Sequence, residues 1–153
     1  MELSISIPLS IREARREDAD GIYQLYSSLS PEDLYMRFFS FHRVTRGEIE
    51  ELVKGGDHVT LVAEEGGKIV GEATLYKDGE FSLVVDPRER GAGLGTKLVQ
   101  ELVRKAKEMG LREVRFYTLP DNMPMIRIGR RLGFKLTFEE DEVLGVLKLD
   151  HHS

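Results

Sequence analysis

The first third of the chain carries apolar residues at every third or fourth position, a spacing typical of amphipathic helices. The clearest case is residues 18–28, where one predicted helix face holds Ala19, Ile22, Leu25 and Tyr26. Ser30 followed by Pro31 predicts a second helix start, and Thr45 with Glu48 has the capping-box spacing of a third. We therefore expect a mostly helical lead-in.

Alternating apolar and β-branched residues replace this pattern in the middle of the chain. A short strand is expected over residues 11–14, and three more follow the helices, over residues 59–63, 68–76 and 80–85. The glycine-containing turns at 64–67 and 77–79 are short enough to join neighbouring strands as hairpins. We therefore expect an antiparallel meander.

Helix and strand patterns alternate over the rest of the chain. Residues 93–109 predict the longest helix, with an apolar stripe formed by Leu94, Leu98, Val99, Leu102, Val103, Ala106 and Met109. Gly110 marks the end of this helix. The predicted order is completed by a strand over 113–118, a helix over 122–132 and a hairpin of residues 134–139 and 143–149.

The composition favours one globular domain over residues 1–153. Hydrophobic residues at 41% and charged residues at 32% are ordinary for a soluble protein of this length. No apolar run approaches 18 residues and the first residues lack a secretory pattern, so we expect a cytoplasmic protein without a membrane segment. The absence of cysteine excludes disulfides and a thiol nucleophile, and the histidines show no metal-ligand spacing.

The formal net charge of −5 narrows the classes of partner. It argues against direct nucleic-acid binding, which usually requires a basic face. It suits a basic, lysine-rich protein partner, although a few negative charges are also ordinary for solubility.

The segment from Val84 to Lys97 carries the most specific chemistry. An apolar strand ends there, a turn with three glycines follows, and a helix begins. Backbone N–H groups at such a helix start bind phosphate, and glycine allows the backbone to approach the ligand closely. Arg88, Arg90 and Lys97 add positive charge nearby. The glycine spacing fits neither a P-loop nor a G-x-G-x-x-G dinucleotide motif, so another phosphate-bearing cofactor is indicated.

This segment resembles the coenzyme A pyrophosphate loop of the GNAT superfamily of acyltransferases, whose pattern is matched by Arg90-x-x-Gly93-x-Gly95. Asn122 at a predicted helix start, with Gly133-Phe134 at the helix end, is similar to the superfamily's second signature. Residues 27–39 and 80–85 resemble the Pat-like protein lysine acetyltransferases. The similarity extends over roughly residues 10–149, nearly the whole chain.

The resemblance implies an α/β (mixed α+β) GNAT fold, with a central, mixed but mostly antiparallel sheet flanked by helices. In that fold the strand before the loop and the strand after its helix run parallel and splay apart. The resemblance also implies acetyl-CoA as the cosubstrate and no metal. The positions that match the family's cofactor contacts are Leu83, Val84, Val85, Arg90, Gly91, Ala92, Gly93, Leu94, Gly95, Thr96 and Asn122.

Acyl transfer to an amine requires a base, because a free lysine has a pKa of about 10.4, and a donor for the oxyanion. The resemblance points to Glu80 as the base, acting directly or through a water, and we expect burial beside the sheet to raise its pKa. Glu72 on the neighbouring strand is the alternative. The splayed strands imply the backbone N–H of Val85 as the oxyanion donor.

One position departs from the family pattern. Many GNAT enzymes carry a tyrosine seven residues after the signature asparagine, where it protonates the departing thiolate. The corresponding residue is Gly129, which has no hydroxyl. The thiolate can then leave without an acid, or water or another residue substitutes. Tyr76 and Tyr117 are possible by strand position.

Together these features predict an acetyl-CoA-dependent N-acetyltransferase that modifies lysine side chains of a protein by direct transfer in a ternary complex. Two alternatives stay open. One is acetylation of a small amine. The other is a catalytically weak, coenzyme A-binding regulatory module, which the missing tyrosine favours.

Overall fold

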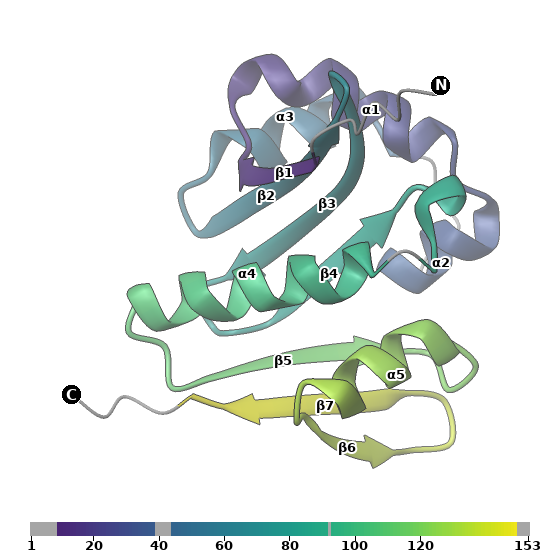
Figure 1. Cartoon of the computed structure of the whole chain (residues 1–153), viewed down its shortest axis with the longest axis vertical. Helices are drawn as coiled ribbons and strands as arrows, with labels where there is room; N and C mark the ends of the chain where they lie inside the picture. The colour runs from purple at the N-terminus through teal and green to yellow at the C-terminus, as the bar shows by residue number, and fades with distance from the viewer. Residues whose placement is uncertain (1–8, 39–43, 92, 150–153) are drawn as a thin grey trace, which may run out of the picture.

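The fold consists of two antiparallel sheets joined at a single point, with helices on both faces (Figure 1). The computed structural model describes residues 9–38, 44–91 and 93–149. The first sheet has the strand order β1-β2-β3-β4: Leu9–Glu13, His58–Glu65, Lys68–Tyr76 and Phe81–Val85. The second has the order β5-β7-β6: Glu113–Thr118, Val143–Lys148 and Lys135–Phe138.

The division into two sheets follows from the expected splaying of β4 and β5. Every strand pair within each sheet is antiparallel. The expected parallel relation between β4 and β5 is present only as an isolated bridge between Glu80 and Arg115. The strands part immediately beyond this bridge, so each sheet keeps its own ladder, while the mixed α/β GNAT-type architecture is confirmed.

The helices have the predicted order, and local signals explain their starts. α1 (Ala19–Ser27), α2 (Pro31–Phe38) and α3 (Arg46–Lys54) lie on one side of the first sheet, and α4 (Leu94–Glu108) lies on the other (Figure 1). α5 (Met123–Arg131) packs on the second sheet, on the same side as α4. The predicted capping box at Thr45 and Glu48 is present, with each side chain bonded to the other residue's backbone N–H.

Two short 3₁₀ turns, η1 (Arg16–Asp18) and η2 (Pro87–Glu89), complete the elements. η1 precedes α1, which begins one residue after the expected start, and the Asp18 carboxylate at the junction is bonded by Arg12 and the Arg15 backbone N–H. Among the described residues, no helix combines the length and the apolar composition that crossing a bilayer requires.

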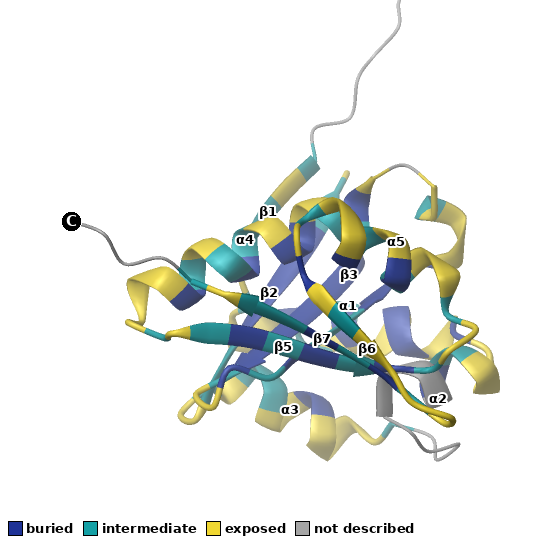
Figure 2. Ribbon diagram, turned by 90° about the horizontal axis from the view of Figure 1, so that it is seen from below, coloured by how far each residue is buried: buried dark blue, intermediate teal, exposed yellow. Residues whose placement is uncertain are grey.

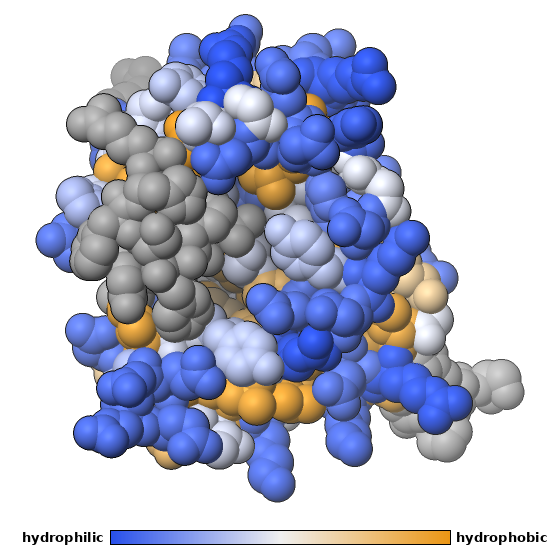
Figure 3. Space-filling view, turned by 180° about the vertical axis from the view of Figure 1, so that it is seen from behind, coloured by the Kyte–Doolittle hydropathy of each residue, from blue (hydrophilic) through white to orange (hydrophobic). Residues whose placement is uncertain are grey.

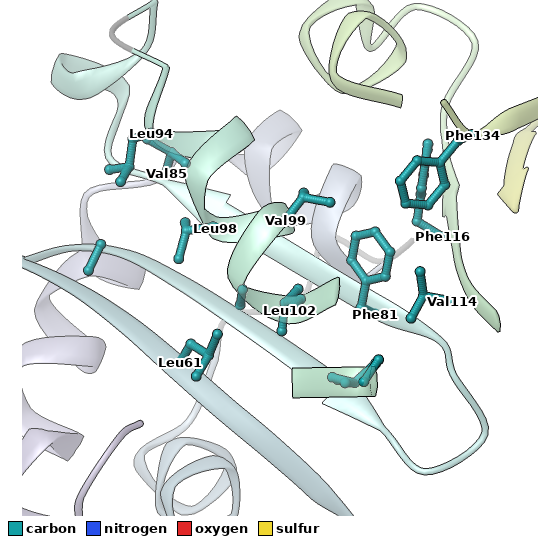
Figure 4. Close-up of a cluster of buried hydrophobic side chains, with 14 of the residues drawn as sticks. Leu61, Phe81, Val85, Leu94, Leu98, Val99, Leu102, Val114, Phe116 and Phe134 are labelled. Carbon is teal, nitrogen blue, oxygen red and sulfur yellow. The ribbon is translucent and has the colours of Figure 1, made fainter. Parts of the chain in front are cut away.

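Two apolar clusters hold the layers together (Figure 2). The larger cluster lies between α4 and the sheets (Figure 4). Leu98 and Leu102 of α4 are fully buried there, and the side chains of Phe81 and Phe116 are at most 2% exposed. The smaller lies beneath α1, α2 and α3 and includes Ile22 and Val84. Because β4 contributes to both clusters, its position is fixed from both faces.

Candidate active site

The candidate site is the gap that opens between β4 and β5. The two strands touch at the Glu80–Arg115 bridge and diverge toward the carboxyl end of each (Figure 1). Arg115 fixes this junction, since its backbone N–H bonds the Gly79 carbonyl at 2.9 Å and its guanidinium bonds the Asp78 carbonyl at 2.6 Å. Gly79 has a φ of +93°, and a Cβ there would lie 2.5 Å from the Glu113 carbonyl oxygen. Only glycine therefore allows this turn to lie against β5.

The register of β4 leaves part of its backbone edge unpaired. Tyr76 donates to the Glu80 carbonyl and Asp86 donates to the Val70 carbonyl, so the even-numbered residues of β4 direct their polar backbone groups toward β3. Those of Leu83 and Val85 point the other way, into the gap. This arrangement turns the backbone N–H of Val85 into the gap and leaves, within the described residues, an open strand edge on this side. Val84 was also predicted to contact the cofactor, but it differs from Leu83 and Val85. Its backbone faces Glu72 on β3, and its side chain is buried.

The turn after β4 is shaped by a buried carboxylate. Asp86 is 1% exposed and caps η2 by accepting a hydrogen bond from the Arg88 backbone N–H at 2.9 Å. Burial alone would raise the pKa of Asp86, but the hydrogen bonds from Arg88 and the charges of Arg88 and Lys68 outweigh it, so the pKa lies below its usual value. Asp86 thus carries a negative charge that ties the turn to Lys68 on β3, with 3.5 Å between the Nζ and Oδ2 atoms.

The three glycines of the loop are required for two different reasons. Gly91 and Gly93 have φ angles of +89° and +82°, which disfavour any residue with a Cβ, although space is open around both. Gly95 has an ordinary backbone, but a Cβ there would lie 2.8 Å from Cδ1 of Ile128 on α5. It therefore permits close packing of α4 on α5. Ala92 lies outside the described residues.

The start of α4 directs backbone N–H groups away from the helix without helical partners. The backbone N–H of Lys97 makes the first helical bond, to the Gly93 carbonyl, so those of Leu94, Gly95 and Thr96 have no helical partner. Gly93 as the N-cap residue has no side chain to satisfy them. The side chain of Leu94 is buried, so its contribution to a ligand would come from its backbone.

Arg90 forms a contact that the sequence did not predict. Its Nη2 atom lies 2.9 Å from Oδ1 of Asp33, which belongs to α2, the helix that packs on β4. Asp33 also closes a capping box with Ser30 at the start of α2. Burial would raise the pKa of Asp33, but the bonds from Ser30 and Arg90 lower it overall. The pair links α2 to the loop, and only the capping-box spacing of Ser30 and Asp33 marks it in the sequence.

The two candidate bases face the same layer but differ in surroundings. Side chains alternate along β4, and Phe81, Leu83 and Val85 pack under α4, so the half-buried Glu80 faces the side of α1 and α2. Glu72 on β3 is fully buried. Its carboxylate accepts hydrogen bonds from the Tyr26 hydroxyl at 3.0 Å and the Thr74 hydroxyl at 2.6 Å. Glu80, at the closed end of the gap beside the bridge to Arg115, is the more accessible of the two.

The signature asparagine lies at the end of β5. Asn122 caps α5 by accepting a hydrogen bond from the Met125 backbone N–H, and its Nδ2 atom donates to Oγ1 of Thr118 at 2.8 Å. Gly129 lies further along α5, where a Cβ would be 3.1 Å from Cζ of Phe116. The structure therefore places the ring of Phe116 where the family's tyrosine would begin.

One face of the second sheet is uncovered beside the gap. The face turned away from α5 carries the half-buried residues Tyr117, Leu144 and Val146, and no helix of the described chain covers it. Apolar side chains are visible on the back of the molecule (Figure 3). The β6–β7 turn over residues 139–142 is wholly acidic and lies at the end where the gap opens (Figure 1). Of the Pat-like segment 27–39, Phe39 lies outside the described residues.

Comparisons with known proteins agree with this geometry. Residues 20–134 match the model of the acetyltransferase (GNAT) family. The chain is 33% identical over 114 residues to acetyltransferase Pat of Mycolicibacterium smegmatis, which covers 68% of this chain and 34% of that protein. It is 25% identical to the putative phosphinothricin acetyltransferase YwnH of Bacillus subtilis, covering 82% of this chain and 83% of the relative. The matched region thus spans about a third of Pat but most of YwnH.

Solved structures have the same architecture. The GNAT domain of S. lividans PAT superposes with a TM-score of 0.84, at 24% identity, over 91% of this chain and 89% of that one. The putative acetyltransferase yncA from Salmonella typhimurium, whose structure contains acetyl-CoA as its cofactor, superposes with a TM-score of 0.79. That chain is 25% identical, and the match covers 95% of this chain and 96% of yncA.

Proposed function

Because the chain belongs to the GNAT family of acetyl-CoA-dependent N-acetyltransferases, we propose that it transfers an acetyl group directly to a lysine side chain of a protein. The observation that carries this proposal is the unpaired backbone edge of Leu83 and Val85, followed at once by the glycine loop and the start of α4. The edge accommodates the extended pantetheine arm and the loop accommodates the pyrophosphate. The thioester then lies in the gap between β4 and β5.

The catalytic roles follow from this placement. Glu80 removes a proton from the lysine ammonium, directly or through a water, and the backbone N–H of Val85 donates to the oxyanion. The neutral amine attacks the thioester carbonyl, the C–S bond breaks and the thiolate departs. The chain contains no cysteine, so no cysteinyl acyl intermediate forms and both substrates are present together. The pyrophosphate is contacted by Arg90, Gly91 and Ala92 and by residues Gly93 to Thr96, and Asn122 contacts the cofactor beside the gap.

Three features support a protein as the acceptor. The face of the second sheet beside the gap is open, so a lysine on a folded partner can reach the thioester across it. The acidic β6–β7 turn and the net charge of −5 attract basic surfaces. The sequence similarity to Pat points the same way.

A small amine is the second candidate acceptor. It is favoured by the match to YwnH, which extends over 83% of that relative, whereas the match to Pat covers only 34%. The β4–β5 gap itself serves either acceptor, because both deliver a primary amine to the same carbonyl. The two candidates differ in how much surface around the gap contributes to binding.

The first experiment tests the base and the cofactor together. Glu80→Gln is compared with Glu113→Gln, a matched control because Glu113 is also half-buried and begins the neighbouring strand. We expect Glu80→Gln to lower turnover by roughly 10²–10⁴-fold and Glu113→Gln to leave it within about threefold. Coenzyme A should raise the melting temperature of all three proteins, since it binds only the folded state. Equal turnover in the two variants would rule out Glu80 as the base.

The second experiment decides the acceptor. The protein is incubated with acetyl-CoA and either folded basic proteins, free lysine or spermidine, and mass shifts are read for each. We expect faster transfer to protein lysines, slowed by salt because charge attraction is screened over about 8–10 Å near physiological ionic strength. Salt-insensitive acetylation of spermidine alone would establish the small-amine alternative.

A further inference from the structure

The family's tyrosine position cannot supply a donor to the leaving sulfur in this chain. Gly129 sits on the face of α5 that packs against β5 and β6, and it is buried. A Cβ there would lie 3.1 Å from Cζ of Phe116 and 3.2 Å from Cδ2 of Leu136. The space is filled by apolar atoms, so a hydroxyl that contacts the sulfur must come from another element.

Thr118 has an unused hydroxyl hydrogen at the appropriate end of β5. The Oδ1 atom of Asn122 accepts the helix-capping bond from Met125, which fixes the orientation of the amide, so Nδ2 is the atom that faces Thr118. Nitrogen Nδ2 can only donate, and Oγ1 of Thr118 is therefore the acceptor in their 2.8 Å bond. Within the described part of the chain, the Thr118 hydroxyl donates no hydrogen bond.

The strand register places Thr118 level with the expected thioester. The parallel bridge pairs Glu80 with Arg115, so three residues further along each strand Thr118 lies level with Leu83, across the gap. Leu83 is one of the two residues whose free backbone edge is proposed to hold the pantetheine arm. Thr118 also shares a strand face with Val114 and Phe116, which pack toward α4 and α5. Its side chain is buried at this end of the strand.

We propose that the Thr118 hydroxyl, oriented by Asn122, donates a hydrogen bond to the sulfur of coenzyme A as the acetyl group leaves; this inference rests on the proposed acetyl transfer. When the tetrahedral intermediate collapses, the C=O bond reforms, the C–S bond breaks and the electron pair passes to sulfur. The threonine keeps its proton and stabilises the thiolate, which is tolerated because an alkyl thiol has a pKa of about 8.5. The thiolate takes its proton from solvent after release.

Turnover of two variants tests the role of the hydroxyl. Thr118→Val keeps the shape of the side chain and removes the hydroxyl, while Thr118→Ser keeps the hydroxyl and removes the methyl group. We expect Thr118→Val to lower kcat by roughly 10–100-fold, the range of one hydrogen bond to a charged group, with KM for acetyl-CoA within about threefold. Thr118→Ser should stay within about threefold of the parent kcat. A serine variant as impaired as the valine variant would assign Thr118 a packing role only.

A second readout needs no acetyl transfer and therefore separates this inference from the proposed function. Free and bound coenzyme A are titrated, and the thiolate is followed by its ultraviolet absorbance. A donor at the sulfur lowers the pKa of the bound thiol by about one unit per tenfold stabilisation of the thiolate. We expect this lowering with the parent protein and Thr118→Ser, and its loss with Thr118→Val. Equal thiol pKa values in the parent and Thr118→Val would overturn the role of Thr118, even in a protein that acetylates lysine normally.

Discussion

The ring of Phe116 lies between two glycines, and this arrangement predicts effects of very different size for the same substitution at each. Gly145 of β7 pairs directly with Phe116, and Gly129 of α5 covers the ring from above. Neither glycine has a left-handed backbone, so both could carry alanine if space alone allowed it. The rings of Phe81 and Phe134 lie 5.7 Å and 5.3 Å from Phe116 between centroids and prevent it from moving sideways.

The distances determine the size of each effect. In Gly145→Ala the new Cβ would lie 2.3 Å from Cε1 and 2.5 Å from Cζ of Phe116, far inside the carbon–carbon contact of about 3.5 Å. Overpacking of this kind costs up to about 3 kcal/mol, and alanine recovers about 0.5–1 kcal/mol of strand stability over glycine. In Gly129→Ala the contacts are 3.1–3.3 Å, and the gain of about 0.8–1.0 kcal/mol in helix propensity offsets them.

We therefore expect Gly145→Ala to lower the free energy of unfolding by about 2 kcal/mol, and Gly129→Ala to change it by less than about 0.5 kcal/mol. Urea titration measures both, and thermal unfolding should show a loss of about 4–8 °C for Gly145→Ala alone. Phe116→Leu removes the atoms that clash, so its combination with Gly145→Ala should be at least about 1 kcal/mol more stable than the sum of the single effects. Equal losses at the two glycines, or strict additivity, would refute the packing argument.

Two further predictions concern the loop and the acid stability of the fold. Gly95→Ala should lower the free energy of unfolding, and adding Ile128→Val should restore it, because valine lacks the Cδ1 atom that lies 2.8 Å from the new Cβ. Gly93→Ala should lower the free energy of unfolding by about 1–2 kcal/mol because of its φ of +82°, and Ile128→Val should not restore it. Urea midpoints measure all of these variants. The hydrogen bonds from Arg12 lower the pKa of Asp18 against the effect of burial, so the stabilisation from its carboxylate is present at neutral pH and is lost as the pH falls below the unfolded pKa of about 3.9. Asp18→Asn should be less stable than the parent protein at pH 7, and its urea midpoint should fall less than that of the parent between pH 5 and pH 2. Identical pH profiles of the two proteins would contradict the assignment.

The element order was predictable because each signal is local. The capping box at Thr45, the stripe of α4 and the glycine turns each depend on residues within a few positions of one another. The splaying of β4 and β5 was expected from the family resemblance alone, because the point at which the two strands stop pairing has no local signal. That point is set by Gly79 and Arg115, which are 36 positions apart and carry no pairing signal in the sequence.

The candidate site was predictable where it consists of a motif and not where it consists of contacts between distant residues. The loop from Arg90 to Thr96 follows from glycine spacing and the start of a helix. The Asp33–Arg90 pair joins residues 57 positions apart, and neither residue type alone predicts it. From the sequence, all three loop glycines were expected to allow close approach of a phosphate. In the structure, a side chain at position 95 is excluded by the contact with Ile128.

The missing tyrosine and the proposed role of Thr118 have one structural origin. Phe116 and Thr118 are two positions apart on β5 and share the face that meets α5. The aromatic ring lies under α5, and a Cβ at position 129 would already be 3.1 Å from its Cζ atom, which leaves no room for the larger side chain of a tyrosine. At the next position on that face the strand ends, the apolar cluster stops and Asn122 provides a polar partner. A hydroxyl can be buried there because its oxygen is already bonded, and in the proposed role its hydrogen is donated to the departing sulfur. On this argument, replacement of Phe116 by a smaller residue alone will not restore a tyrosine-dependent reaction, whereas loss of the Thr118 hydroxyl will impair the reaction that the chain performs.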